Sequence, residues 1–152
     1  PLNMDCIAKK NNVVSEIPVK VKTKIKPHYN VAVGIIWDRN KILITKRKNN
    51  GLLGGLWEFP GGKIEDNESV FEAVKREIKE ELSISIDTHQ LLDTIKHQFS
   101  HFSVSISAIK CQYTKGEVEL NGPCDYMWIK PDDIHRYPFP KSSTKLFHTI
   151  GV

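Results

Sequence analysis

Several short runs of the chain are dominated by β-branched and other apolar residues, or alternate them with polar ones. Residues 31–37 (VAVGIIW) and 41–47 (KILITKR) are separated by three polar residues, Asp38-Arg39-Asn40, an arrangement typical of a β-hairpin. In residues 102–108 the apolar side chains alternate with serines, which predicts a strand with one buried face. Further strands are predicted at residues 91–99 and 126–129.

A helical period follows a capping sequence in the middle of the chain. Ser69 and Glu72 stand in the positions of a capping box, in which the serine accepts from the glutamate amide and the glutamate side chain bonds back. A helix is therefore predicted to begin there. Apolar residues then recur every fourth position, forming a narrow stripe that is expected to pack on a sheet. The stripe consists of Val70, Val74, Ile78 and Leu82.

Three further segments are predicted around these elements. Residues 49–62 are glycine-rich and are expected to form a structured loop attached to the core through Leu56, Trp57 and Phe59. Residues 131–134 are predicted to form a brief helical turn. Residues 141–150 are predicted to form a closing helix capped by Ser142 or Ser143.

Length and composition indicate one ordinary globular domain. The chain has 152 residues, of which 39% are hydrophobic and 26% charged. Residues 1–28 are polar and lysine-rich and are interrupted by Pro18 and Pro27, so they are interpreted as an arm or linker, and the folded domain is expected to span residues 29–152. The sequence contains no long apolar run or signal-peptide pattern, which favours a cytoplasmic location without a membrane partner.

The net charge of +4 is unevenly distributed. Lys20, Lys22, Lys24 and Lys26 alternate with less polar residues, so one edge of this segment is basic. Such an edge can contact nucleic-acid phosphates, or it can be a solvated strand edge protected by lysines; the second interpretation is favoured. Cys6, Cys111 and Cys124 are scattered and indicate neither a disulfide framework nor a zinc site.

The predicted helix gathers like charges at its C-terminal end. Glu77 lies three residues before Glu80 and four before Glu81, so all three project from one face and repel one another. One interpretation is a solvated face neutralised by the neighbouring Lys75, Arg76 and Lys79. The other is a divalent metal site, because clustered carboxylate oxygens are the ligands that Mg²⁺ and Mn²⁺ prefer.

The spacing around these carboxylates distinguishes the two interpretations. The order is Gly62, five residues, Glu68, seven residues, Arg76-Glu77-Ile78, one residue, Glu80-Glu81, one residue and Ser83-Ile84. This order resembles the Nudix box, G-x5-E-x7-R-E-U-x-E-E-x-G-U with U aliphatic. One defined position differs, since Ser83 stands where the family has glycine. A helix ending there needs a residue that adopts left-handed backbone angles, which serine does at a small energetic cost.

This resemblance implies a fold, a reaction and a set of roles. Nudix hydrolases have an α/β (α+β) fold with a mixed, curved sheet between helices, and they cleave nucleoside diphosphate linkages with Mg²⁺ or Mn²⁺ and water. Glu77, Glu80, Glu81 and the Gly61 carbonyl would bind metal. Glu77 would also help to deprotonate water, Arg76 would orient Glu77, and Glu68 would brace the loop that begins at Gly62.

A closer resemblance extends beyond the box. Residues 51–65, 96–106 and 126–146 resemble the C-terminal Nudix-like domain of A/G-specific adenine DNA glycosylases, which recognises 8-oxoguanine opposite adenine. In that family a Phe-Ser-His element contacts the lesion, and it is matched by Phe99, Ser100 and His101. Phe139, Lys141 and Ser142 fall where Nudix enzymes acting on 8-oxo-dGTP contact the base. Cys6 and its flanking residues are similar to the last ligand of the glycosylase 4Fe–4S motif, so a cluster would form only in a longer parent chain.

Two functions from different classes remain open. The favoured hypothesis is a DNA-repair module that recognises 8-oxoguanine in duplex DNA, joined in cis to an N-terminal glycosylase domain and associated with the bacterial nucleoid. The alternative is a free-standing, Mg²⁺-dependent pyrophosphohydrolase acting on 8-oxo-dGTP or a related nucleotide. Glycosylases of this kind often lack the catalytic glutamates, whereas this chain retains Arg76, Glu77, Glu80 and Glu81. A third, weaker possibility is hydrolysis of another nucleotide.

Overall fold

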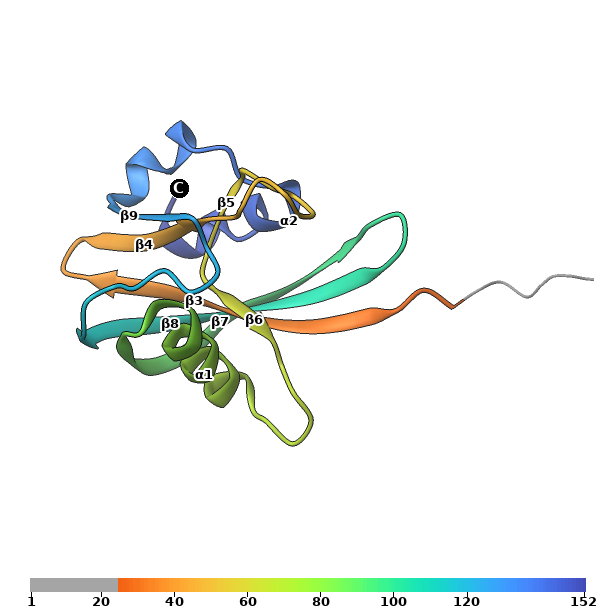
Figure 1. Cartoon of the computed structure of the whole chain (residues 1–152), viewed down its shortest axis with the longest axis horizontal. Coiled ribbons are helices and arrows are strands. Elements are labelled where there is room, and N and C mark those ends of the chain that lie inside the picture. The colour runs from red at the N-terminus through yellow and green to blue at the C-terminus, as the bar shows by residue number, and fades with distance from the viewer. Residues whose placement is uncertain (1–24) are drawn as a thin grey trace, which may run out of the picture.

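The computed structural model describes residues 25–152, so the predictions for Cys6, for residues 1–24 of the arm and for Lys20, Lys22 and Lys24 lie outside the described residues. Seven strands, one long helix and three short helical segments follow one another along this part of the chain (Figure 1). They are β3 (His28–Asp38), β4 (Lys41–Lys46), β5 (Trp57–Glu58), β6 (Gly61–Lys63), α1 (Val70–Leu82), β7 (Ser85–Gln98), β8 (Ser103–Lys115), β9 (Asp125–Ile129), η2 (Pro131–Arg136), α2 (Lys141–Thr144) and η3 (Phe147–Ile150).

The strands form one mixed sheet with β3 at its centre. The order is β5-β4-β3-β8-β7, with β6 also pairing with β3 and β9 with β4. β3 runs antiparallel to β4 and β6 but parallel to β8, with Val31 opposite both Lys63 and Ile106. The predicted hairpin of β3 and β4 is confirmed, and Arg39 in its turn has a positive φ of 61°.

Two hydrophobic cores cover the two faces of this sheet. Because successive side chains of a strand point to opposite faces, Ile36 joins the core beneath α1, whereas Ile35 joins the core beneath the C-terminal segments. The predicted stripe of α1 is confirmed, with Val74, Ile78 and Leu82 fully buried. Figure 1 shows α1 on one side of the sheet and the C-terminal segments on the other, which is the sheet-between-helices arrangement expected from the box.

Two predicted elements differ from the structure. The strand predicted at residues 91–99 begins at Ser85, and its first part was missed because β7 is an edge strand with exposed polar residues and three register shifts against β8. The predicted closing helix is divided into α2 and η3, so neither Ser142 nor Ser143 caps it. Pro140 is the first cap residue, without a side-chain hydrogen bond, and Ser142 is buried instead.

Of the other short segments, the predicted loop at residues 49–62 contains two short strands that the sequence did not predict, β5 and the start of β6; they were missed because glycines interrupt the apolar pattern there. β9 and the 3₁₀ turn η2 occupy the predicted positions. Trp57 and Phe59 are buried in the second core, which attaches the glycine-rich loop to the sheet. Within residues 25–152, none of the helices has the length and apolar composition needed to cross a membrane.

Candidate active site

Both ends of α1 have the geometry that the sequence predicts. The Glu72 amide donates to the Ser69 hydroxyl over 3.1 Å, and the Ser69 amide donates to the Glu72 carboxylate over 2.9 Å. At the other end, Ser83 has left-handed angles of φ 60° and ψ 22°, and its amide donates to the Lys79 carbonyl. Serine therefore occupies the conformation for which the box sequence uses glycine.

Arg76 uses all five of its N–H groups to fasten the loop to the helix. Its Nε and Nη2 donate to the two oxygens of Glu68 over 2.6 and 3.0 Å, and Nη2 also donates to the Lys63 carbonyl over 2.9 Å. Its Nη1 donates to Glu77 over 2.9 Å and to Glu80 over 3.2 Å. The guanidinium holds the pKa of Glu68 below its usual value, chiefly through the hydrogen bonds, and the carboxylates raise the pKa of Arg76. This pairing is the arrangement expected for Arg76 as the group that orients Glu77.

The two glycines of β6 allow the backbone to lie directly against its neighbours. A Cβ on Gly62 would lie 2.4 Å from the Glu77 carboxylate, and a Cβ on Gly61 would lie 2.1 Å from the Ala32 carbonyl oxygen. A side chain at Gly62 would therefore displace Glu77, while one at Gly61 would separate β6 from β3. The box glycines thus place the backbone of β6 beside the carboxylate of α1.

Glu81 lies on the opposite side of the cluster from Arg76 and carries an unbalanced charge. Burial, followed by the charges of Glu77 and Glu58, raises the pKa of the Glu81 carboxyl to about 7. Glu58 belongs to β5, and burial raises its pKa as well, although Arg47 acts in the opposite direction through a 2.9 Å ion pair. The sequence analysis did not predict Glu58 as a site residue. The one indication was that Glu58 is charged although its neighbours Leu56, Trp57 and Phe59 are apolar.

The donor set at this end of α1 suits a hard divalent cation. Glu77 and Glu81 supply carboxylate oxygens, and their mutual repulsion would become attraction around Mg²⁺ or Mn²⁺. In the part of the chain that the structure describes, no three acidic, histidine or cysteine side chains converge as a ready-made metal site. Glu80 is largely exposed and bonds to Arg76, so its side chain would have to turn away from Arg76 to join such a site.

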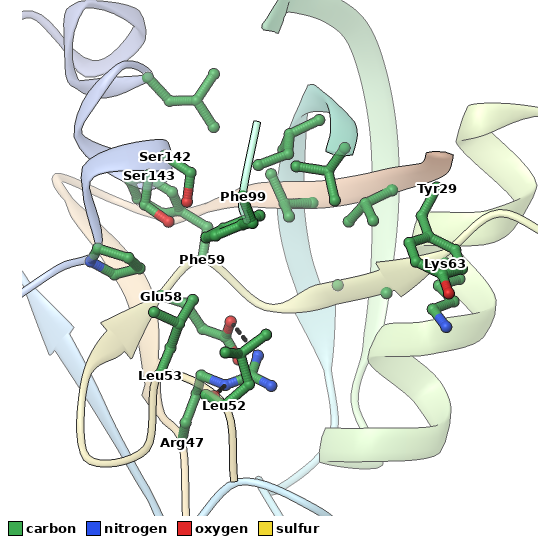
Figure 2. Close-up of a pocket in the computed structure, with 18 of the residues that line it drawn as sticks. Tyr29, Arg47, Leu52, Leu53, Glu58, Phe59, Lys63, Phe99, Ser142 and Ser143 are labelled. Atoms are coloured by element: carbon green, nitrogen blue, oxygen red, sulfur yellow. Dashed lines mark hydrogen bonds and ion pairs between the residues drawn. The ribbon is translucent and has the colours of Figure 1, made fainter. Parts of the chain in front are cut away.

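A largely apolar cavity of about 340 Å³ opens beside the box glycines (Figure 2). Its size lies at the lower end of the range for small-molecule sites. Arg47, Glu58 and Lys63 supply charged groups at its wall, and Lys63 Nζ lies 4.1 Å from the centre of the Tyr29 ring. The rest of the wall comes from β3, the loop after β4, the β5–β6 segment, the β7–β8 turn, β8 and the C-terminal segment: Tyr29, Val31, Val33, Leu52, Leu53, Phe59, Gly61, Gly62, Phe99, Phe102, Val104, Ile106, Pro140, Ser142, Ser143 and Leu146.

The residues predicted to recognise a base are only partly brought together. Phe99 and Ser142 line the cavity. Phe99 stacks on Phe102 at 4.6 Å, and its amide donates to the Phe102 carbonyl over 2.7 Å, which leaves Ser100 and His101 exposed at the tip of the turn. Phe139 packs against Phe59 and Phe147 in the second core.

Comparison with known proteins places the chain in a family. Residues 32–149 match the family model described as a NUDIX domain, so the chain belongs to the Nudix family. It is 39% identical over 101 residues to an 8-oxo-dGTP diphosphatase of Proteus vulgaris, a match that covers 65% of this chain and 90% of that protein. It is 32% identical over 121 residues to an 8-oxo-dGTP diphosphatase of Buchnera aphidicola, covering 80% and 92% of the two chains.

A solved structure supports the fold. The crystal structure of a MutT NUDIX hydrolase from Burkholderia pseudomallei aligns with a TM-score of 0.74 at 24% identity and covers 82% of this chain and 99% of that one. At this identity the likeness supports the fold alone. Both of these relatives are named as diphosphatases and not as glycosylases. Their names therefore support the pyrophosphohydrolase hypothesis better than the hypothesis of a glycosylase recognition domain.

Proposed function

We propose that this domain is a divalent-metal-dependent pyrophosphohydrolase that acts on 8-oxo-dGTP or a closely related purine nucleoside triphosphate. The single observation that carries the proposal is the apolar cavity bordered by Gly61, Gly62 and Glu58, because it gives a base a site next to the carboxylates of α1. The names of the two curated relatives support 8-oxo-dGTP as the substrate.

The roles of the chain's own groups follow from this arrangement. Glu77 accepts the proton of the attacking water, and Arg76 holds the Glu77 carboxylate in place. Water adds to a phosphorus atom, the bond from that phosphorus to the bridging oxygen breaks, and the nucleoside monophosphate and pyrophosphate leave. Glu77, Glu80, Glu81 and the Gly61 carbonyl would hold a Mg²⁺ or Mn²⁺ ion, which would supply positive charge to the phosphates and lower the pKa of water.

The base is proposed to lie between the aromatic and aliphatic walls of the cavity. 8-Oxoguanine differs from guanine by a hydrogen on N7 and an oxygen on C8, so a site that selects it needs an acceptor for the N7 hydrogen. The buried Ser142 hydroxyl lines the cavity and can accept such a bond. Phe99 supplies an aromatic face at the mouth.

The direct test measures pyrophosphate release from 8-oxo-dGTP and from dGTP, with and without Mg²⁺. We expect metal-dependent turnover that prefers 8-oxo-dGTP and that Glu77→Gln reduces by a factor on the order of 10² or more, as for loss of a general base. Absence of turnover from folded wild-type protein would overturn the proposal, and equal turnover by Glu77→Gln would assign the activity to a contaminant.

A second candidate is the 8-oxoguanine-recognition domain of an adenine glycosylase. It is favoured by the position of the Phe99-Ser100-His101 element, since Phe99 lines the cavity while Ser100 and His101 are exposed at the end of the β7–β8 hairpin. Figure 1 shows the end of this hairpin projecting from the sheet away from α1. Such a projection suits contact with a lesion in duplex DNA.

The two candidates predict different binding results. Fluorescence anisotropy with duplexes that contain 8-oxoguanine or guanine opposite adenine measures recognition directly. The recognition module predicts a preference for the lesion that is lost in Ser100→Ala/His101→Ala protein and kept in Glu77→Gln. Equal affinity for the two duplexes would exclude it.

A further inference from the structure

The two side chains proposed to contact the base lie on different elements. Ser142 belongs to α2, a single turn of four residues that begins after Pro140 without a side-chain cap, and Phe99 follows the end of β7. Both line the cavity, as Figure 2 shows. One turn of helix has almost no stability of its own. The spacing between Ser142 and Phe99 therefore depends on what holds α2 against β7.

Lys145 makes polar contacts between these two elements. It is the residue directly after α2, and its Nζ donates to His97 Nδ1 over 2.9 Å and to the Lys96 carbonyl over 3.2 Å. The His97 ring packs edge-on against the Phe99 ring, with 4.7 Å between the ring centres. A chain of direct contacts therefore runs from α2 through Lys145 and His97 to the aromatic side chain in the cavity wall.

His97 can accept the bond from Lys145 only while its Nδ1 carries no proton, because an ammonium group is a donor without a lone pair. Burial, followed by the charges of Lys145 and Lys141, lowers the pKa of His97. The residue opposite His97 on β8 is the apolar Val104, which lines the cavity. The side chain of Lys96, one position earlier on β7, points to the other face of the sheet.

The other histidines with partners near this part of the sheet have separate contacts. His28 bonds to the hydroxyls of Ser103 and Ser105, whose positions on β8 alternate with the cavity-facing ones and so point to the opposite face. His148 Nε2 lies 2.8 Å from Asp93 Oδ2. This pair also joins the C-terminal segment to β7, and protonation of His148 strengthens it.

We propose that Lys145 and His97 are positioning residues for the base: they fasten α2 to β7 and so set the spacing between Ser142 and Phe99. Neither lines the cavity, so they act through their neighbours and not by touching the substrate. This inference rests on the proposed function and adds two residues that the sequence did not indicate. The alternative is that the fully buried Leu146 alone holds α2 in place and that the polar contacts are incidental.

Steady-state kinetics on either side of the usual histidine pKa, at about pH 7.5 and about pH 5.5, separate these two possibilities. KM and kcat for 8-oxo-dGTP are measured for wild-type protein, Lys145→Met and His97→Gln. Methionine removes the donor but keeps an unbranched side chain, and glutamine keeps an acceptor for Lys145 that cannot be protonated. Lys110→Met is the matched control, because Lys110 is exposed on β8 and lines no part of the cavity.

At about pH 7.5 we expect Lys145→Met to raise KM roughly threefold to tenfold, the range of one or two partly exposed hydrogen bonds. Its kcat should stay within about twofold of wild type, because the contacts to the base are equal in the ground and transition states. Lys110→Met should resemble wild type. Equal KM values for Lys145→Met and Lys110→Met would overturn the inference, as would a loss of kcat without a rise in KM.

The pH profile adds a readout that simple destabilisation would not move. As the pH falls below about 6.5, a proton on His97 replaces the bond to Lys145 by repulsion, so the wild-type KM should rise above that of His97→Gln. The effect of Lys145→Met should shrink in the same range. The divergence should be larger in a His148→Gln background, which lacks the contact that strengthens in acid. Parallel profiles for wild type and His97→Gln would contradict the inference.

Hydrogen exchange of residues 141–150, followed by mass spectrometry without substrate, gives a result that does not depend on the proposed function. At about pH 7.5 we expect faster exchange in this segment for Lys145→Met and wild-type rates for Lys110→Met, while protection in α1 shows that each variant folds. Unchanged exchange in Lys145→Met would overturn the inference even for an active enzyme. Absence of turnover by folded wild-type protein would instead refute the proposed function, and exchange would still decide whether Lys145 holds α2.

Discussion

Replacing Arg76 is expected to destabilise the metal-free domain more than any other single charge change on α1. The side chain is 23% exposed, and its partners Glu68 and Glu77 are 14% and 16% exposed. Arg76→Gln would remove the positive charge and leave both carboxylates partly buried without a counter-ion.

The size of the effect follows from the five hydrogen bonds of Arg76. Each bond to a charged group contributes about 1.5–3 kcal/mol where water is excluded, but water reaches part of this cluster and relieves some of the loss. We expect a total of about 3 kcal/mol, or roughly 10 °C in Tm for a domain of this size. Arg76→Lys keeps the charge but has three donors in place of five, so about half of the loss is expected.

The assay is thermal and urea unfolding in EDTA, followed by circular dichroism. Lys75→Gln is the matched control, because Lys75 is the exposed neighbour on the same helix and such surface changes usually stay within about 0.5 kcal/mol. If Arg76→Gln unfolds within 1 kcal/mol of the Lys75→Gln control, about the smallest difference that such measurements separate, the idea that Arg76 fastens the box loop is refuted.

Three further predictions concern single groups. In EDTA, Glu81→Gln should stabilise the domain by about 1–3 kcal/mol above pH 7, because a carboxyl whose pKa is raised to about 7 opposes folding increasingly as the pH rises from roughly 4.5; a gain of the same size at pH 4 would contradict this. Gly62→Ala should fold but weaken Mn²⁺ binding by displacing Glu77, whereas Gly61→Ala should lower Tm by separating two strands, and the reverse order of effects would refute the geometric argument. Burial raises the pKa of the Cys111 thiol to about 12, so it should react with iodoacetamide only after unfolding, as measured by mass spectrometry of the alkylated peptide.

Local patterns were sufficient to predict the helix and most strands. The capping box of Ser69 and Glu72 fixed the start of α1, and the box spacing identified the need for left-handed angles at Ser83, both of which the structure confirms. These features depend on residues that are close in sequence. They could be predicted because one helix contains both the apolar stripe and the acidic face.

Features that depend on distant pairings could not be predicted in this way. Glu58 becomes part of the site only because β5 pairs with β4 and comes close to α1. The closing segment was wrongly predicted as one capped helix, since Leu146, Phe147 and Ile150 pack together in the second core through a turn that the serine pattern did not reveal. The first part of β7 was missed because exposed polar residues and register shifts obscure its period.

The turn that joins β7 to β8 lies apart from the carboxylates of α1, so its sequence can change without affecting them. Phe99 contributes to the cavity wall, yet Ser100 and His101 make none of its lining, and no hydrogen bond among the described residues joins this turn to Glu77 or Arg76. Insertions or substitutions at Ser100 and His101 would therefore change the exposed end of the hairpin while the carboxylates of α1 stay where they are. If the proposed function holds, the contacts that this surface makes with a bound molecule can therefore diverge without moving Glu77 or Arg76.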